Sequence, residues 1–422
     1  MKTVRHTRGS RRLSLAAVTG TAALLLTACG GGSGFEDEGG GDGGEQSSGG
    51  PITVLIGSSG DAETNAVTDA VNAWAEESGT DAKVQVAADL NQQLAQGFAG
   101  GKPADVFYLS TDQLAAYAGN GSLEPYAADL ENSGEFFPAL EEAFTYEDEF
   151  WCAPKDFSTL GLLINNRLWE DAGLTEDDIP TTWEELRSVA EQLTDGKKPG
   201  LAFGPEYQRV GVFFEQNGGG LVSDDGSEAT VNSAENVEAL TFVQDMMKDG
   251  VAAWSSDIGA GWGGEAFGKE LSAMTIEGNW IAGAMENDFP DIDYQVAPLP
   301  AGPEGEATLQ YTNCWGIAAD SDNIEGSVEL VDYLTAAEQQ MAFADAFGVM
   351  PSVEPAAEEW KEAYPEMAAF IDSADFARNL PTQEGANDVI ADMNAQLAGL
   401  KGGNPQQILD GVQQNMEAVV SQ

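Results

Sequence analysis

Residues 52–87 read ITVLIGSSGDAETNAVTDAVNAWAEESGTDAKVQVA, and this stretch decides the fold class. Two short apolar runs of strand type, 52–56 and 83–87, enclose a longer segment with helical spacing. One face of that segment carries the apolar residues Val67, Ala70, Val71 and Trp74. A strand, a helix and a strand in this order favour a mostly parallel sheet covered by helices, so the sequence predicts an α/β fold.

The same alternation continues along the chain. Expected helices cover 90–98, 111–118, 183–193 and 234–248, and expected strands cover 105–109, 160–164 and 271–276. Thr182 and Glu185 have the spacing of a capping box at the start of the third of these helices. Helices dominate the C-terminal third, and neither an internal repeat nor a low-complexity segment interrupts residues 51–422.

The N-terminus predicts export. Basic residues precede an apolar run, Leu13 to Ala28, which is shorter than the ~20 residues that span a bilayer. Leu26-Thr27-Ala28-Cys29 resembles the bacterial lipobox, so residues 1–28 are predicted to be a lipoprotein signal peptide with lipidation at Cys29. The alternative is a buried helix that ends in a cysteine by chance. Residues 29–50, rich in Gly and acids, are expected to tether the protein to the extracellular face of the cell membrane.

Charge and histidine content exclude several classes of function. The chain carries a formal charge of −53, and loss of five basic signal residues gives −58, so we expect no nucleic-acid partner. The only histidine, His6, lies in the signal, which excludes Ser-His-Asp chemistry and most catalytic zinc sites. No cofactor and no metal are predicted. A carboxylate pair of the glycosidase type remains open.

Two cysteines follow Cys29. Cys152 and Cys314 are an even number in an oxidising compartment, which predicts a disulfide, with two buried thiols as the alternative.

Three motifs resemble one family. Gly101 to Phe107 (GKPADVF) is similar to a strand entry, 153–166 (APKDFSTLGLLINN) looks like an inter-lobe crossing, and 271–280 (LSAMTIEGNW) resembles a strand that presents a tryptophan at a cleft. Together they resemble the family 1, maltose-binding-protein-like sugar-binding lipoproteins of ABC importers.

The resemblance implies a two-lobe periplasmic-binding-protein-like fold with discontinuous lobes joined by a hinge. The N-terminal lobe would comprise 51–156 plus 315–375, and the C-terminal lobe 157–310 plus 376–422. Both cysteines would then lie near hinge crossings, which supports the disulfide. The implied partners are a small neutral carbohydrate and ABC permease subunits, with the protein itself a monomer.

A sugar site needs carboxylates and amides beside an aromatic plane. Position in the family and this chemistry select the predicted ligand-binding residues Ser59, Asp112, Asp156, Trp262, Glu277, Asn279, Trp280, Tyr311, Trp315 and Arg378. Each tryptophan could instead be core, Asp112 could begin a helix, Asp156 could pair with Lys155, and Glu277 could brace its turn. Gln113 and Ser158 depart from the family pattern, so the particular sugar does not transfer.

The function expected from these features is the solute-binding component of an ABC importer, which captures an extracellular di- or oligosaccharide by hinge closure and catalyses no reaction. Few cations near the cleft favour a neutral ligand over a phosphorylated one. The alternatives are a lipid-anchored glycosidase and a non-transport receptor lipoprotein.

Overall fold

The computed structural model describes residues 49–223 and 225–421. The predicted signal peptide, Cys29 and tether residues 29–48 lie outside the described residues. Within the described part, no helix is both long and apolar enough to cross a membrane.

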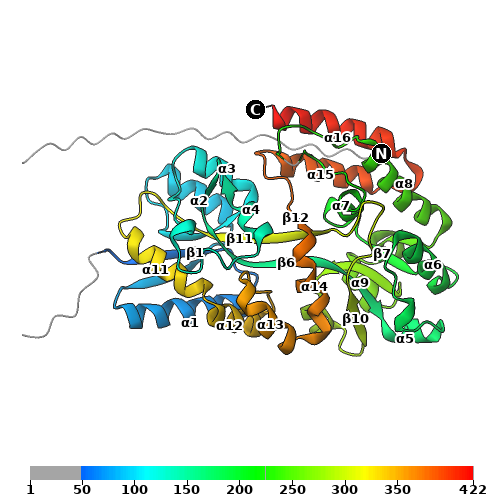
Figure 1. Ribbon diagram of the computed structural model, residues 1–422, viewed down its shortest axis with the longest axis horizontal. Coiled ribbons are helices and arrows are strands. Elements are labelled where there is room, and N and C mark those ends of the chain that lie inside the picture. The colour runs from blue at the N-terminus through cyan, green and yellow to red at the C-terminus, as the bar shows by residue number, and fades with distance from the viewer. Residues whose placement is uncertain (1–48, 224, 422) are drawn as a thin grey trace, which may run out of the picture. The chain divides into compact units, whose positions relative to one another are not determined.

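A ten-stranded sheet runs through the fold in the order β2-β1-β3-β11-β6-β9-β7-β8, with β10 paired to β6 and β12 paired to β11 (Figure 1). The parallel pairs β1–β2, β1–β3, β7–β8 and β7–β9 confirm the expected α/β class, whereas β11 runs antiparallel to both β3 and β6. The strands are β1 Ile52–Ile56, β2 Ala82–Val86, β3 Val106–Ser110, β4 Thr145–Tyr146, β5 Glu149–Phe150, β6 Ala153–Asn165, β7 Leu201–Phe203, β8 Ala252–Trp254, β9 Met274–Gly278, β10 Tyr294–Ala297, β11 Thr308–Ile317 and β12 Ala377–Arg378.

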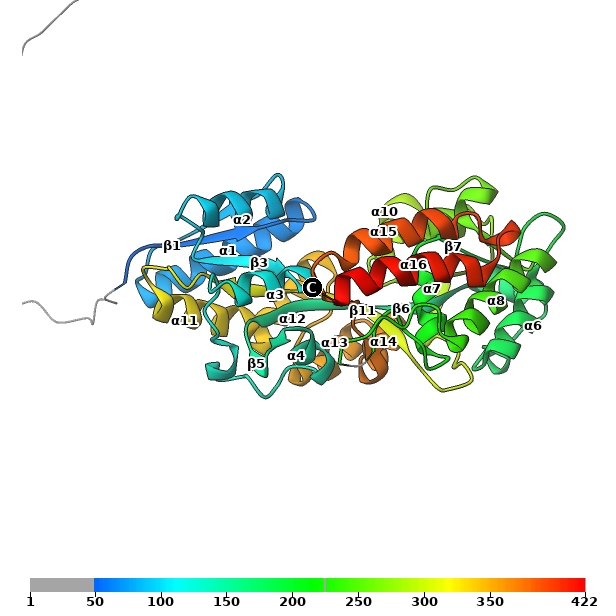
Figure 2. The ribbon, with the colours of Figure 1, turned by 90° about the horizontal axis from the view of Figure 1, so that it is seen from above.

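Segments far apart in sequence pack together. Helix α1 contacts α11 and α12, and α16 contacts both α15 and α8 (Figures 1 and 2). The helices are α1 Asp61–Ser78, α2 Leu90–Ala99, α3 Thr111–Gly119, α4 Pro138–Ala143, α5 Asn166–Asp171, α6 Trp183–Leu193, α7 Tyr207–Glu215, α8 Ala234–Asp249, α9 Gly263–Gly268, α10 Ile281–Asp288, α11 Ile324–Thr335, α12 Ala337–Phe347, α13 Glu354–Ala363, α14 Ala368–Asp372, α15 Ala386–Leu397 and α16 Pro405–Val420.

Local sequence explains most helix boundaries. The apolar face predicted for α1 is buried, and the helix ends at Gly79, whose φ of 73° is a left-handed cap that glycine adopts readily. Thr182 caps α6 by accepting from the Glu185 amide, as the capping-box spacing predicts. The other half of the box differs, because the Glu185 carboxylate accepts from the amide and hydroxyl of Thr181 instead of from Thr182.

Two apolar clusters form the core. The first is built mainly from β1, β3, α1, α4 and residues 314–374, and the second mainly from β6, α6, α7, α8, α15 and α16. This division follows the two predicted lobes, although five residues of the second predicted lobe join the first cluster, namely Phe157, Leu163, Phe267, Ile281 and Met285. The lobe boundaries themselves stay predictions.

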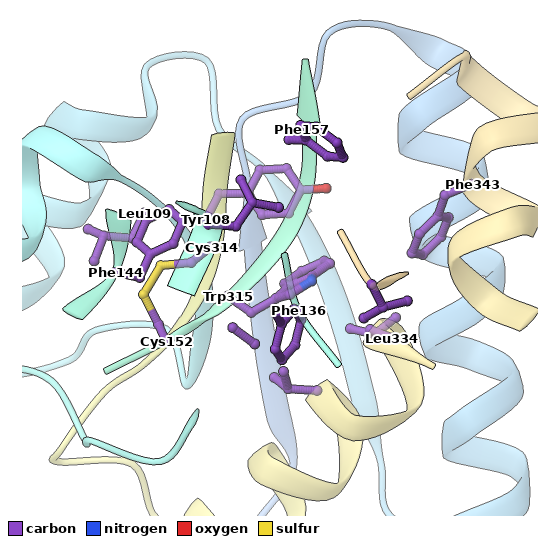
Figure 3. Packing of buried hydrophobic residues seen from close by; sticks show 14 of the residues in the cluster. Tyr108, Leu109, Phe136, Phe144, Cys152, Phe157, Cys314, Trp315, Leu334 and Phe343 are labelled. Atoms are coloured by element: carbon purple, nitrogen blue, oxygen red, sulfur yellow. A yellow bond between two sulfur atoms is a disulfide. The ribbon is translucent and has the colours of Figure 1, made fainter. Parts of the chain in front are cut away.

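Cys152 and Cys314 form a disulfide inside the first cluster, with their Cα atoms 5.7 Å apart (Figure 3). The bond joins the segment just before β6 to β11, so it links the two strands that cross between the clusters. The alternative of two buried thiols does not hold in this structure.

Candidate functional site

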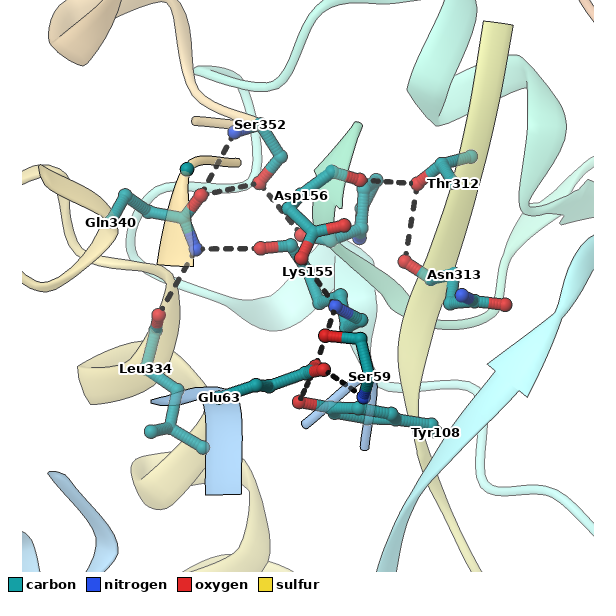
Figure 4. A network of polar contacts seen from close by, with 12 residues as sticks. Ser59, Glu63, Tyr108, Lys155, Asp156, Thr312, Asn313, Leu334, Gln340 and Ser352 are labelled. Atoms are coloured by element: carbon teal, nitrogen blue, oxygen red, sulfur yellow. Dashed lines mark hydrogen bonds and ion pairs between the residues drawn. The ribbon is translucent and has the colours of Figure 1, made fainter. Parts of the chain in front are cut away.

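The site is organised by β6 and β11, which pair antiparallel at the centre of the sheet. Asp156 pairs with Asn313 and Pro154 pairs with Cys314, so Lys155 is the extra residue of a β-bulge. The side chains of Gln340 and Ser352 hold this bulge by donating to the carbonyls of Lys155 (2.9 Å) and Pro154 (2.7 Å) (Figure 4). A bulge re-aims a side chain, and here it turns Lys155 toward α1.

A first pocket, the strand pocket, has a volume of about 350 Å³ and is lined by Asp112, Asp156, Ser158, Gln310, Tyr311 and Asn387 among others. Gln310 is only 3% exposed. Its amide nitrogen donates to the Ala139 carbonyl (2.9 Å) and to Asn379 (2.7 Å), which fixes the amide orientation. The Gln310 Oε1 atom is buried and has no protein hydrogen-bond partner.

A second pocket, the aromatic pocket, has a volume of about 980 Å³ and is lined by Ser59, Glu63, Trp280, Tyr294, Trp360 and Tyr364 among others. Asn279 also lines it and is 2% exposed. The Asn279 amide nitrogen donates to the Gly348 carbonyl (3.3 Å), and its Oδ1 atom has no protein partner. The lining of each pocket therefore includes one residue whose amide oxygen is buried and has no protein partner.

Glu63, Lys155 and Asp156 form the lysine cluster (Figure 4). Asp156 lines the strand pocket and Glu63 lines the aromatic pocket, so the cluster lies between the two. Lys155 Nζ lies 3.3 Å from Glu63 Oε1 and pairs with Asp156 as well. Tyr108 donates to Glu63 Oε1 (3.0 Å), and the Ser59 amide donates to Glu63 Oε2 (2.7 Å). All three charged side chains are buried.

Burial and charge compete within the lysine cluster. Burial alone would lower the pKa of Lys155, but the charges of Asp156 and Glu63 raise it. For Asp156, burial outweighs the attraction of Lys155 and raises the pKa. For Glu63, burial is opposed by Lys155 and by the hydrogen bonds from Ser59 and Tyr108, and the pKa is lowered. One cation therefore holds two carboxylates of unequal acidity.

Arg209, Glu277, Trp280 and Tyr311 form the arginine cluster. The Arg209 guanidinium pairs with Glu277 Oε2 at 2.6 Å, and Trp280 Nε1 donates to the same oxygen at 3.1 Å. The Arg209 Cζ atom lies 5.1 Å from the Trp280 ring centroid, and the Tyr311 ring meets the Trp280 ring edge-on at 5.5 Å. Burial raises the pKa of Glu277 in spite of Arg209.

Six of the predicted ligand-binding residues line the two pockets. Asp112, Asp156 and Tyr311 line the strand pocket, and Ser59, Asn279 and Trp280 line the aromatic pocket. Glu277 is 1% exposed and lines neither. Glu277 accepts a hydrogen bond from Trp280 Nε1 and so braces the turn that carries this residue, which was the alternative interpretation of Glu277. Asp156 forms the ion pair with Lys155 that was the alternative interpretation of this residue, and it also lines the strand pocket.

Three predicted site residues lie elsewhere. Trp315 is 1% exposed and packs edge-on against Tyr108 at 4.8 Å, because its side chain points into the first core cluster (Figure 3). Arg378 does not line the strand pocket but an adjoining cavity of about 600 Å³, which shares Asn379, Leu380 and Pro381 with that pocket. Trp262 lies over Gly264 of its own helix and packs on the first core cluster, so it lines neither pocket.

Sequence reasoning missed Glu63, Gln310, Asn387 and Arg209. No local pattern marks them, because Arg209 and Glu277 are 68 residues apart and Glu63 and Lys155 are 92 residues apart. One signal was available for Arg209. Only four arginines follow residue 50. In so acidic a chain, each of them is a candidate for an ion pair with a buried carboxylate, because a buried charge needs a partner of opposite sign.

With this geometry in place, the comparison with known families is decisive. Residues 58–341 match the model of the bacterial extracellular solute-binding proteins. The chain belongs to this family. The match covers both predicted lobes as far as α12.

Relatives and solved structures agree with this assignment. A putative binding protein of Brucella abortus is 23% identical over 350 residues, which cover 78% of this chain and 83% of that protein. A cyclic α-maltosyl-1,6-maltose binding protein from Arthrobacter globiformis superposes with a TM-score of 0.78 at 21% identity, covering 88% of this chain and 99% of the other. An ABC substrate-binding protein from Listeria monocytogenes, solved with cycloalternan, gives 0.74 at 23%, with coverage of 88% and 99%. At these identities the likeness shows the two-lobe fold.

Proposed function

We propose that this solute-binding protein captures an extracellular di- or oligosaccharide and delivers it to an ABC permease. The observation that carries the proposal is Trp280. Among the described residues, Val86 and Trp280 are the large apolar side chains that remain exposed, and Trp280 is 38% exposed inside a pocket. A sugar has C–H faces that suit an aromatic plane and hydroxyls that suit adjacent acceptors such as Asn279.

Two features support an extended, neutral ligand. Polar side chains line both pockets, and Asp156 of the strand pocket and Glu63 of the aromatic pocket share Lys155, so an extended ligand with hydroxyls along its length would find polar partners in both. Among the described residues that line the two pockets there is no lysine and no arginine. A phosphorylated ligand usually meets several fixed cations, so this lining favours a neutral saccharide.

The predicted hinge closure has support in two hydrogen bonds. The Asn387 amide donates to Asp112 (2.7 Å), and the Asn279 amide donates to the Gly348 carbonyl (3.3 Å). Each bond joins a segment of one predicted lobe to a segment of the other. A ligand that contacts both lobes only in the closed form would shift the equilibrium between the open and closed forms by the difference in its affinity for them.

The two alternatives have less support. The cleft carboxylates that a glycosidase would use are engaged, since Asp156 pairs with Lys155 and Glu277 lies under Trp280 without lining a pocket. The relatives named above are described as binding proteins. A receptor that serves no transporter would keep the fold but have no permease partner. Lipid attachment at Cys29 would keep the monomeric protein beside its permease, outside the cell.

The test is a thermal-shift screen of residues 29–422 against mono-, di- and oligosaccharides, followed by calorimetry. At a hundredfold excess over Kd a bound sugar should stabilise the protein by about 2.7 kcal/mol. The expected hits are neutral oligosaccharides, and Trp280→Ala should weaken their binding. A folded protein that responds to no saccharide would contradict the carbohydrate assignment, and turnover of nitrophenyl glycosides that Asp156→Asn abolishes would favour the glycosidase.

A further inference from the structure

Trp280 would be a loose platform if nothing fixed its ring. It stands at the turn between β9 and α10, with 38% of its side chain exposed, so its own packing restrains it only in part. Gly278 supplies one restraint, since a Cβ at this position would lie 2.2 Å from the Trp280 ring. The absence of a side chain at 278 lets the ring approach its own strand, but it does not select the orientation.

The orientation is selected by groups from outside the turn. Glu277 Oε2 accepts from Trp280 Nε1 at 3.1 Å, and the same oxygen accepts from Arg209 at 2.6 Å. The Arg209 guanidinium also lies 5.1 Å from the Trp280 ring centroid, within the ~6 Å of a cation–π contact. Arg209 thus restrains Trp280 in two ways: its guanidinium contacts the indole ring, and it pairs with the Glu277 carboxylate that accepts from the indole N–H.

Arg209 is itself held in place. It lies in the first turn of α7, and its neighbour Gln208 accepts from the Tyr311 hydroxyl at 2.6 Å. The Tyr207 amide donates to Asn394 of α15 at 2.7 Å, which fixes the start of the helix. The Arg209 side chain is 15% exposed, against 54% for Arg167 and 37% for Arg187, whose ion pairs lie at the surface.

We propose that Arg209 is the positioning residue of the sugar site, which fixes the Trp280 ring through the shared Glu277 carboxylate and a cation–π contact of its guanidinium. This inference rests on the proposed function, because it gives Trp280 its role as the platform. A planar guanidinium suits this task because it can stack on an indole while its N–H groups reach a carboxylate. Lysine offers a point charge without the plane, so Arg209→Lys should keep the ion pair and lose the contact of the planar group with the ring.

The experiment first measures Trp280 without any sugar. Acrylamide quenching of tryptophan fluorescence is recorded for wild type and Arg209→Gln, each minus its Trp280→Phe counterpart, so that the difference reports Trp280 alone. Arg209→Gln should raise the quenching constant of Trp280 about twofold, and Arg209→Lys, which keeps the ion pair with Glu277, should raise it by a smaller amount. Arg187→Gln removes the same charge from a surface pair and should change nothing. If Arg209→Gln does not fold, Arg209→Lys decides. An unchanged quenching constant in a folded variant would overturn the proposal.

The second arm measures the affinity for maltotetraose, a linear four-glucose probe. Arg209→Gln should weaken binding about tenfold in the wild-type background and less than about twofold in the Trp280→Ala background. Equal losses in both backgrounds would overturn the positioning role, because Arg209 would then act on the sugar itself. If wild type does not bind maltotetraose, the proposed function fails for this sugar, and the quenching result still decides the role of Arg209.

Discussion

The lysine cluster and the arginine cluster are both buried ion clusters at the cleft, and they are built differently. In the lysine cluster one ammonium is shared by two carboxylates that come from α1 and from the β6 bulge. In the arginine cluster one guanidinium meets one carboxylate beneath an indole. The first keeps a net negative charge next to both pockets, whereas the second is a neutral pair.

The difference suggests a division of labour. A compact ammonium can pair with carboxylates from two elements without fixing the orientation of either carboxylate. Asp156 therefore pairs with Lys155 and still lines the strand pocket. A planar guanidinium restricts the group stacked on it, which suits a ring that must be presented in one orientation. The lysine cluster therefore provides hydrogen-bond acceptors, and the arginine cluster fixes the orientation of the Trp280 ring.

The largest expected effect comes from removing the shared cation. Lys155→Met should lower the free energy of unfolding by about 3–5 kcal/mol at neutral pH, because the carboxylates of Glu63 and Asp156 would remain buried without a cation beside them. The pKa of each carboxyl would then lie above its unfolded value, so protonation would relieve the loss. Stability of the variant relative to wild type should recover as the pH falls from 7.5 to 5.

Urea unfolding at the two pH values checks this prediction. Lys269→Met is the matched control, because Lys269 is 48% exposed and pairs with Glu265 four residues away. A Lys155→Met variant as stable as this control would show that the lysine cluster does not stabilise the fold.

The next effect concerns the disulfide, which lies three residues before Lys155 and has no counterpart beside Arg209. Cys152→Ala with Cys314→Ala should lower stability by about 2–4 kcal/mol, since the bond closes a long loop between β6 and β11. Chemical denaturation measures the loss. Two free thiols in denatured, unreduced protein carrying Cys29→Ser would contradict the bond itself.

A smaller effect is expected where the lysine cluster meets the ligand. Asp156→Asn should weaken binding of the best saccharide from the screen about tenfold, because it exchanges a charged acceptor for a neutral amide in the strand pocket. Calorimetry measures the change, and Asp245→Asn, on an exposed face of α8, serves as the control. Unchanged affinity would remove Asp156 from the site.

The smallest effect should separate a buried arginine from an exposed one. Arg187→Gln breaks a pair with Asp249 whose side chains are 37% and 54% exposed, and solvent screens such a pair. We expect a loss of at most about 0.5 kcal/mol in urea unfolding, whereas Arg209→Gln should cost several times more. Equal losses would mean that burial does not distinguish the two arginines.

The sequence predicted the fold well because its signals are local. Apolar spacing located α2, α3, α6 and α8 to within a residue or two and the buried face of α1, and the motif at 271–280 placed Trp280 at a pocket. Trp315 and Arg378 do not line the two pockets, because the side of the sheet that a strand residue faces depends on the register with the neighbouring strands, which no local pattern encodes. Arg209 and Glu63 were missed because their partners lie 68 and 92 residues away.

The most direct test of the central claim is a calorimetric titration of the best saccharide into wild type, Trp280→Ala and Trp262→Ala. Trp280→Ala should lose about 10- to 100-fold in affinity, because the exposed indole is the platform of the aromatic pocket. Trp262→Ala should stay within about twofold of wild type, because Trp262 lines neither pocket. Wild-type affinity in Trp280→Ala, or a large loss in Trp262→Ala alone, would contradict the account.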